Sequence, residues 1–153
     1  MSTRAITYLR NKNIPFDVVK YHHQEKGAQF AARATGYPIE QTVKTLVVVL
    51  DRKRYALALL PGHLELNLKK LAAIASVKRA AMVDTKTAER LTGYLVGGIS
   101  PFGTQQAMWT VMEESILENT QVLINAGQRG VMLKMGPGDI AAALECKVAS
   151  IAG

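Results

Sequence analysis

The spacing of hydrophobic and polar residues predicts short strands and single helices that alternate irregularly. Ser2 is a candidate cap for a first helix that carries Ile6 and Leu9 on one face. A short strand over residues 16–19 and a second helix over residues 29–35 are expected to follow. The first part of the chain is therefore expected to be a helix–strand–helix unit.

The middle of the chain predicts a hairpin followed by capped helices. Residues 43–50 and 55–60 are rich in β-branched and large apolar residues, and the charged segment 51–54 between them is typical of a turn. Asn67 and Asp84 each precede a stretch with helical spacing, so both are expected to cap helices. Further elements are expected as strands over residues 81–83, 94–96, 109–112, 121–124, 131–135 and 147–151, and as a helix opened by Pro137.

This order of elements sets the fold class. Strict alternation of strand and helix would predict a doubly wound parallel sheet, but hairpins and singly inserted helices interrupt it here. We therefore expect an α+β fold with a mixed, strongly curved sheet. Neither a repeat nor a linker divides the chain, so residues 1–153 are expected to form one domain.

Composition narrows the class of protein. The 153 residues are 48% hydrophobic, which suffices for a buried core. The single cysteine, Cys146, excludes an internal disulfide and a C-x-x-C metal site. Apolar runs such as residues 46–50 are far shorter than the ~20 residues that a membrane-spanning helix needs, and the first residues lack the apolar core of a signal peptide. A cytoplasmic protein without a membrane partner is expected.

The charge distribution favours a polyanionic partner without requiring one. The net charge is +7, and phosphate contacts gain affinity by releasing counterions. Basic residues gather at 52–54, 69–70 and 78–79, whereas residues 91–128 contain no Lys or Arg. A charge-poor pocket with basic flanks suits a small substrate that is carried on a nucleic acid.

The most unusual segment is Gly97-Gly98-Ile99-Ser100-Pro101. Its glycines and proline indicate backbone conformations that most residues avoid. Such a loop can turn several N–H groups inward as a cradle for a phosphate, a carboxylate or a developing oxyanion. The alternative is a plain turn, and the glycine patterns of the common nucleotide sites are missing.

Three charged residues each allow two interpretations. Lys44 precedes an apolar strand, where its ammonium either projects into a cleft to hold a carbonyl or phosphate oxygen or extends to water. Asp139, in the first turn of the last expected helix, either favours the helix dipole or binds a substrate ammonium group. Arg129 either belongs to a plain hairpin turn over residues 125–130 or contacts a phosphate.

The residues favour neither a metal site nor a catalytic triad. His22 and His23 are adjacent, so on a strand they point to opposite faces, and His63 lies far from both in the sequence. Cys146 has no surrounding motif, and Ser100 lacks the G-x-S-x-G context of a nucleophile. We therefore expect neither a metal nor a cofactor.

Several segments in a fixed order carry a resemblance to a known family. The most specific are residues 92–101, Thr-Gly-Tyr-Leu-Val-Gly-Gly-Ile-Ser-Pro, and residues 126–130, Ala-Gly-Gln-Arg-Gly. The others are Ile14-Pro15-Phe16, Tyr21, Val43-Lys44-Thr45-Leu46 and Leu66-Asn67-Leu68-Lys69-Lys70. Together they resemble the YbaK family, also called the prolyl-tRNA-synthetase-associated domain family, of free-standing trans-editing deacylases, over nearly the whole chain.

The resemblance implies a curved, barrel-like mixed sheet with helices packed outside. It implies that Lys44 is the family's essential lysine and that Gly97 to Pro101 form its substrate loop. Tyr21, Asn125 and Asp139 fall at other pocket-lining positions of the family. With Thr45, Gly127 and Arg129 they complete the set that we expect to bind substrate.

The implied activity is hydrolysis in trans of mischarged tRNA without a metal. The threonine after Lys44 is similar to the branch that acts on cysteinyl-tRNA for proline, Cys-tRNA(Pro). In this interpretation the amides of Gly97 to Ser100 grip the aminoacyl carbonyl and Lys44 holds the terminal adenosine or phosphate. The resemblance further implies that the substrate's own thiol attacks its ester. The expected partner is the tRNA acceptor end. Prolyl-tRNA synthetase stays open as a second partner, and DNA is not expected to bind.

The sequence also departs from the family pattern. Thr104-Gln105-Gln106-Ala107 replaces a basic cluster, Asn125-Ala126 replaces serine-glycine, Val43 replaces an aromatic residue, and residues 30–33 lack the usual acidic residues. Three alternatives therefore stay open. They are a deacylase for alanyl or seryl groups, a catalytically weak module that binds tRNA or a synthetase, and a small-molecule hydrolase unrelated to tRNA.

Overall fold

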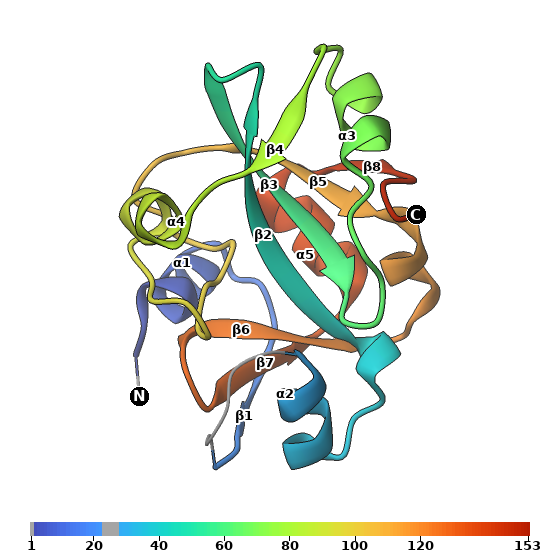
Figure 1. Ribbon diagram of the computed structural model, residues 1–153. Helices are drawn as coiled ribbons and strands as arrows, with labels where there is room; N and C mark the ends of the chain where they lie inside the picture. The colour runs from blue at the N-terminus through green and yellow to red at the C-terminus, as the bar shows by residue number, and fades with distance from the viewer. Residues whose placement is uncertain (1, 23–27) are drawn as a thin grey trace.

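One mixed sheet of eight strands, with five α-helices, makes up the described part of the chain in a computed structural model (Figure 1). The structure describes residues 2–22 and 28–153, so His23 lies outside the described residues. The strands are β1 (Asp17–Lys20), β2 (Thr42–Leu50), β3 (Arg54–Pro61), β4 (Ala80–Met82), β5 (Trp109–Glu113), β6 (Val122–Gln128), β7 (Val131–Met135) and β8 (Lys147–Ala149). The helices are α1 (Arg4–Asn11), α2 (Ala28–Thr35), α3 (Leu68–Ile74), α4 (Thr85–Thr92) and α5 (Pro137–Leu144), with short 3-10 helices η1 (Ile39–Gln41) and η2 (Glu114–Glu118).

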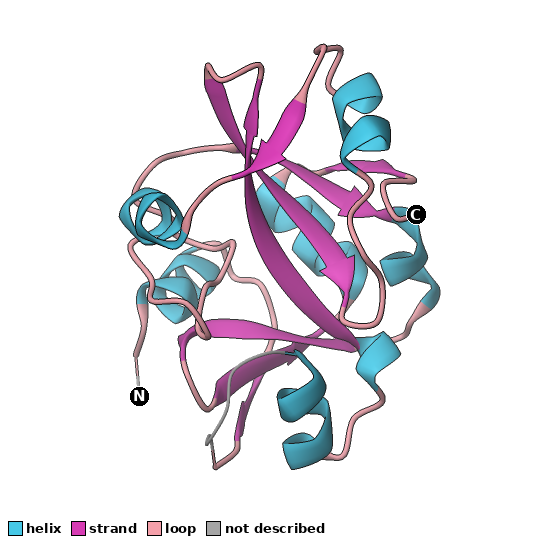
Figure 2. Cartoon of the chain, viewed as in Figure 1, coloured by secondary structure: helices cyan, strands magenta, loops and turns pink. Residues whose placement is uncertain are grey.

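The sheet confirms the expected fold class. Its strand order is β1-β7-β6-β2-β3-β5-β8, with β4 paired to β2 beside this path. The β2–β3, β6–β7 and β1–β7 pairs are antiparallel, whereas β2–β6, β3–β5 and β5–β8 are parallel. The helices lie around the curved sheet (Figure 2), and none of those described is long and apolar enough to cross a membrane.

The central strand β2 has one edge that is shared by two diverging strands. β3 pairs with the opposite edge from Val43 to Leu50. On the shared edge, β6 pairs only at Thr42 and Val43, and β4 pairs only at Val48 to Leu50. Among the described residues no strand therefore pairs with this edge between Lys44 and Val47.

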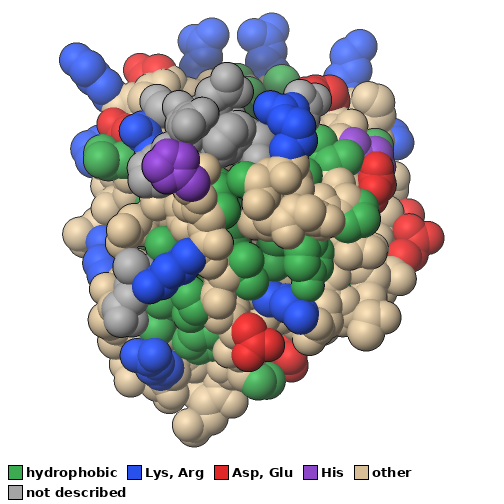
Figure 3. Space-filling model, turned by 90° about the horizontal axis from the view of Figure 1, so that it is seen from below, with side chains coloured by type: hydrophobic (Ala, Val, Ile, Leu, Met, Phe, Trp, Pro, Cys, Tyr) green, Lys and Arg blue, Asp and Glu red, His purple; other side chains and the backbone are tan. Residues whose placement is uncertain are grey.

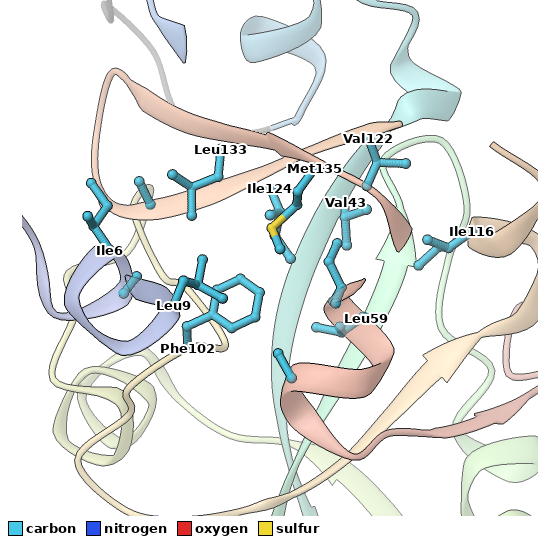
Figure 4. Close-up of a cluster of buried hydrophobic side chains, with 14 of the residues drawn as sticks. Ile6, Leu9, Val43, Leu59, Phe102, Ile116, Val122, Ile124, Leu133 and Met135 are labelled. Carbon is cyan, nitrogen blue, oxygen red and sulfur yellow. The ribbon is translucent and has the colours of Figure 1, made fainter. Parts of the chain in front are cut away.

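A core cluster anchors the end of the glycine-rich loop. Ile6 and Leu9 of α1 lie beside Phe102, and Leu133 of β7 faces them from the sheet (Figure 4). Phe102 is fully buried, and its ring centroid lies 6.0 Å from that of Tyr8. Because burying such a side chain contributes ~1.5–3 kcal/mol, the chain directly after Pro101 is held firmly in the core.

Local expectations were wrong at the start of α1 and after α4. Thr3, not Ser2, caps α1, since its Oγ1 accepts a hydrogen bond from the Ile6 amide at 3.2 Å. Residues 94–96 form a loop instead of a strand. The Tyr94 side chain is buried in the core, and the peptide groups of Val96 bond to side chains instead of to a neighbouring strand.

The expected turn over residues 125–130 is shorter than predicted. β6 continues through most of this segment to Gln128, with a bulge between Asn125 and Gln128. The turn into β7 is thereby confined to Arg129 and Gly130. Because a bulge breaks the alternation of side chains along a strand, the residues around Gly127 face the glycine-rich loop in directions that a regular strand would not give.

Candidate active site

A pocket of about 360 Å³ opens where β6 and β4 diverge from β2, a volume within the usual range for small-ligand sites. Its walls are the unpaired edge of β2, the segment between β4 and α4, the glycine-rich loop, and parts of β6 and β7. The lining residues are Tyr21, Thr42, Val43, Lys44, Thr45, Leu46, Val47, Met82, Val83, Asp84, Thr85, Ala88, Val96, Gly97, Ile99, Asn125 and Met132.

The pocket brings together half of the residues predicted for the site. These are Tyr21, Lys44, Thr45, Gly97, Ile99 and Asn125. A second hollow, on the side of the loop toward Tyr94, is lined by three more: Gly98, Gly127 and Arg129. The remaining three, Ser100, Pro101 and Asp139, line neither hollow.

Ser100 and Pro101 support the loop instead of facing the pocket. Both are buried, and Ser100 Oγ accepts a hydrogen bond from the Phe102 amide at 3.3 Å. Ser100 is therefore a hydrogen-bonding residue of the loop, as its sequence context favoured, and its hydroxyl is not presented to a substrate.

Asp139 lies apart from the pocket. It is half-buried in the first turn of α5, which lies behind the β2–β3 hairpin in the view of Figure 1. Its Oδ2 lies 3.3 Å from the position that a Cβ on Gly136 would take. This geometry supports the favourable charge at the helix N-terminus and not the binding of a substrate ammonium group in this pocket.

Two charged side chains hold the peptide groups on both sides of Val96. Glu89 Oε2 accepts a hydrogen bond from the Val96 amide at 2.9 Å. Arg129 Nε and Nη2 both donate to the Val96 carbonyl, at 2.9 and 2.7 Å. We call these three residues the Val96 clamp. Arg129 was expected to bind a substrate, and the structure gives it this internal partner.

The loop also packs closely against the turn between β6 and β7. A Cβ on Gly98 would lie 2.9 Å from the Arg129 amide nitrogen, so only glycine fits there. The Gly98 amide itself donates to the Leu95 carbonyl at 3.0 Å. Within residues 2–22 and 28–153, the amides of Gly97 and Ile99 have no hydrogen-bond partner. Among the same residues the Ser100 amide also makes no hydrogen bond, but Ser100 lines neither hollow, so of the four expected amides those of Gly97 and Ile99 remain at the pocket.

Two buried polar atoms of the pocket residues also lack partners. Among the described residues, neither Thr45 Oγ1 nor Asn125 Oδ1 makes a hydrogen bond. An unpaired buried polar atom costs roughly 1–3 kcal/mol. Both oxygens are shielded from solvent, so a ligand that bonds to them requires rotation of these two side chains.

The charged groups of the lining are few. Among the described lining residues, Lys44 is the cation and Asp84 is the anion. Hydrogen bonds from Thr87 lower the pKa of Asp84, whose Oδ1 lies 2.8 Å from the Thr87 amide. Asp84 is therefore ionised at neutral pH, and the pocket presents one charge of each sign.

Two other titratable groups near the core stay neutral at physiological pH. Burial raises the pKa of Tyr94 to about 12, although Arg4 partly opposes this shift, and its hydroxyl donates to the Phe102 carbonyl. Burial also raises the pKa of Cys146 to about 12. Neither the phenol nor the thiol is poised as a nucleophile. In the part of the chain that the structure describes, no three His, Cys, Asp or Glu side chains gather as metal ligands.

Comparison with known proteins places the fold and the pocket in a family. The profile of the family described as "Aminoacyl-tRNA editing domain" matches residues 22–143, a range that contains every described residue of the pocket except Tyr21. The chain belongs to this family. The aminoacyl-tRNA editing domain is thus formed by most of the chain, and the predicted resemblance is confirmed at the level of the family.

Individual relatives agree with this assignment. The editing domain is 30% identical over 137 residues to an Enterococcus faecalis protein named "Putative Cys-tRNA(Pro)/Cys-tRNA(Cys) deacylase EbsC", covering 88% of this chain and 84% of that protein. It is 31% identical over 108 residues to a proline--tRNA ligase of Nitrosomonas eutropha, covering 71% of this chain and 18% of the ligase.

Solved structures share the fold. A structure described as "a putative trans-editing enzyme for prolyl tRNA synthetase" superposes with a TM-score of 0.90 at 24% identity, covering 100% of this chain and 99% of that one. The hypothetical protein APE2540 superposes with a TM-score of 0.92 at 20% identity, covering 99% and 100%. At these identities the likeness establishes the fold of the editing domain.

Several residues of the site were not predicted from the sequence. Met82 lines the pocket from the end of β4, and Val83 and Asp84 line it from the segment between β4 and α4. Asp84 was recognised only as a helix cap, a role that it also fulfils. Glu89 gave no signal, because a glutamate in a short helix is usually a solvated residue; its partner is set by the path of the loop.

Proposed function

We propose that this editing domain is a deacylase that hydrolyses mischarged tRNA in trans, with Cys-tRNA(Pro) as its substrate. One observation carries the proposal: Lys44, the unpartnered amides of Gly97 and Ile99, and the unpartnered Thr45 Oγ1 and Asn125 Oδ1 belong to one pocket. An ester that ends in an ammonium group and a small side chain supplies both the acceptor and the donors that these groups lack.

The two free amides suit the developing oxyanion. As the ester carbonyl is attacked, negative charge grows on its oxygen, and fixed N–H donors stabilise this charge more than the ground state. Gly97 and Ile99 donate to this oxygen, and the Val96 clamp keeps them in place. Lys44 holds the ribose or phosphate of the terminal adenosine through its ammonium group. Asn125 Oδ1, which is shielded from solvent in the structure, accepts a hydrogen bond from the substrate ammonium after its side chain rotates.

The attacking atom comes from the substrate. The thiolate sulfur of the cysteinyl group attacks its own ester carbonyl, so a C–S bond forms and the ester C–O bond breaks. The proton that the thiol has given up passes to the leaving ribose oxygen, which yields uncharged tRNA and a cysteine thiolactone. Water then opens the thiolactone to free cysteine, which completes the hydrolysis. This route needs only orientation within the pocket. It fits the burial of Ser100 and the raised pKa of Cys146, which leave these two side chains unsuited as nucleophiles.

The relatives support the choice of substrate and partner. The Enterococcus relative is named for deacylation of Cys-tRNA(Pro) and Cys-tRNA(Cys), and the match to part of a proline--tRNA ligase points to tRNA(Pro) and its synthetase. We therefore include the acceptor end of tRNA(Pro), and contact with prolyl-tRNA synthetase, in the proposal.

Deacylation of a panel of mischarged tRNAs tests this function. Cysteinyl-, alanyl- and seryl-tRNA(Pro) are incubated with the wild type, with Lys44→Ala and with the control Lys20→Ala, which changes an exposed lysine of β1. We expect the wild type to release cysteine fastest and Lys44→Ala to lose about 100-fold in kcat/KM, because the contact that positions the ester is lost. The melting temperature should stay unchanged.

Three results would contradict the proposal. Near-wild-type turnover by Lys44→Ala would remove the lysine from the chemistry. Faster release of alanine or serine than of cysteine would show that no substrate thiol is needed. Retention of charged tRNA with the ester intact would identify a binding module instead of an enzyme.

A further inference from the structure

Four basic side chains from three separate segments surround one hollow at the end of the β2–β3 hairpin. Arg52 lies in the hairpin turn, Lys69 in the first turn of α3, and Lys78 and Arg79 in the segment before β4. All four are exposed, and the hollow between them has a volume of about 340 Å³. We call these four residues the hairpin surface.

Main-chain contacts hold the hairpin surface together. Asp51 Oδ1 accepts hydrogen bonds from the amides of Lys78 and Arg79, at 3.1 and 2.9 Å, and the Asp51 amide donates to the Arg79 carbonyl. The one carboxylate among the described lining residues is thus directed at the backbone. None of the four basic side chains forms an ion pair with a described residue, so the surface keeps an excess of positive charge.

We infer that the hairpin surface binds phosphates of the tRNA acceptor stem while the terminal aminoacyl group occupies the pocket. This inference rests on the proposed function and adds the path of the nucleic acid. Unpaired Lys and Arg side chains around a concave site suit a phosphate backbone, since their charge gains affinity by releasing counterions from it.

The hairpin surface adjoins the pocket through two strands. Val47 and Val83 line the pocket, whereas Val49 and Ala81, two residues away on the same segments, line the hollow. From Lys44 to the end of β2 at Leu50 the strand rises by about 20 Å at ~3.3 Å per residue. A single-stranded 3′ end seated in the pocket therefore brings the phosphates that precede it to the hairpin surface.

The side of the pocket formed by the glycine-rich loop offers less positive charge. The glycine-rich loop and the chain after it, residues 91–128, contain no Lys or Arg. On the face shown in Figure 3, Lys and Arg side chains lie scattered around a group of hydrophobic side chains. The basic cluster expected after the loop is absent, and the hairpin surface supplies phosphate contacts on the opposite wall.

The hairpin surface is unsuited to a lipid bilayer. Binding at a membrane surface combines basic residues with apolar side chains that insert among the acyl chains. The large exposed hydrophobic residues of the described chain are Val18, Met82, Leu95, Leu117 and Val148, and none of these lines the hollow. Nucleic acid is therefore the polyanion that the surface favours.

A pair of charge reversals tests the inference. Lys69→Glu/Lys78→Glu changes the hairpin surface, and Arg10→Glu/Lys20→Glu makes the same change of charge on α1 and β1. All four side chains are exposed, so both variants should fold. Each is assayed on full-length Cys-tRNA(Pro) and on cysteinyl-adenosine, which lacks the stem.

We expect KM for the tRNA to rise about tenfold or more for the hairpin variant, with kcat at saturation unchanged. The dependence of log KM on log salt should weaken by roughly 0.7–0.9 for each lost phosphate contact. Hydrolysis of cysteinyl-adenosine should equal that of the wild type, and the control variant should resemble the wild type on both substrates.

Three results would overturn the inference. The first is an unchanged KM and salt dependence for the hairpin variant, and the second is an equal loss in the control. The third is binding of the wild type, but not the hairpin variant, to vesicles of anionic lipid with tRNA affinity unaffected. If the wild type hydrolyses neither tRNA nor cysteinyl-adenosine, the proposed function fails instead, and direct binding of uncharged tRNA(Pro) then decides the role of the hairpin surface.

Discussion

The peptide groups around Val96 show how charged side chains can act on a pocket without entering it. Glu89 accepts a hydrogen bond from the Val96 amide, and Arg129 donates to the Val96 carbonyl. The backbone that leads into Gly97 is therefore fixed in position. Hydrogen bonds to charged groups contribute ~1.5–3 kcal/mol each. The amides of Gly97 and Ile99 are therefore oriented before a substrate arrives, which avoids a reorganisation cost during the reaction.

Arg129→Lys should slow the reaction more than it weakens binding. Lysine cannot make two parallel N–H contacts to one carbonyl, so the loop loses its fixed position. We expect kcat to fall about tenfold, with KM changed less than threefold and the fold intact by circular dichroism. Arg90→Lys, an exposed change on α4, serves as the control. A raised KM with normal kcat would instead show that Arg129 contacts a phosphate.

At the scale of single residues, site residues could be predicted from the sequence where the residue type has few structural roles at its position. Lys44 ahead of an apolar strand and Gly97 in a glycine-rich loop both proved to line the pocket. The role of Glu89 could not be interpreted from the sequence, and two roles stayed open for Asp139, because a carboxylate in a helix has several ordinary roles. Which one applies depends on the chain segment packed beside it, and that information is not local.

At the scale of elements, the bulge in β6 shapes the wall between the two hollows. Gly127 lies in this bulge with φ +96, and a Cβ there would lie 2.5 Å from Cε1 of Tyr94. The ring of Tyr94 thus rests directly on the backbone of β6. The contact joins the glycine-rich loop to the sheet.

Gly127→Ala should destabilise the protein strongly. The positive φ and the collision with a buried ring together cost roughly 2–4 kcal/mol, measurable as a lower midpoint in urea denaturation. Gly138→Ala is the matched control: nothing lies within 4 Å of the added Cβ in α5, so stability should stay the same or rise slightly. Equal midpoints for the two variants would contradict the role assigned to the bulge.

The elements themselves were largely predictable from the sequence, and the exceptions have a physical cause. The β2–β3 hairpin and the caps of α3 and α4 follow from apolar runs and from Asn67 and Asp84. The bulge was taken for a turn, because Asn125 to Gly130 has the composition of one. Only the pairing with β7 shows that the strand continues. Strand pairing depends on tertiary contacts, which the residues of one segment do not determine.

For the whole molecule, a buried carboxylate fastens the end of the chain. Glu113, only 4% exposed at the end of β5, accepts hydrogen bonds from the amides of Ser115, Ile151 and Ala152 at 2.8, 3.0 and 3.2 Å. Burial alone raises the pKa of Glu113, but these hydrogen bonds outweigh it, and the pKa lies below its ordinary value.

The stability of the fold should therefore depend on Glu113 in a defined pH range. Because its folded-state pKa is lowered, its contribution is complete above the ordinary glutamate pKa of about 4.3 and is lost as the pH falls through the lowered value. Glu113→Gln should cost roughly 1–3 kcal/mol at pH 7, and the difference from the wild type should shrink toward pH 3. Glu114→Gln is the exposed control. A pH-independent difference would contradict the assignment.

The divergence of β6 and β4 from β2 has a consequence for how selectivity can change. The opening exists because hydrogen-bonded ladders end there, so its span is a property of the main chain and survives exchange of the side chains. Thr45, Met82 and Met132 line this space. Replacing them alters the depth and polarity of the pocket while the backbone around it stays the same. These three positions are therefore the best place to change substrate selectivity.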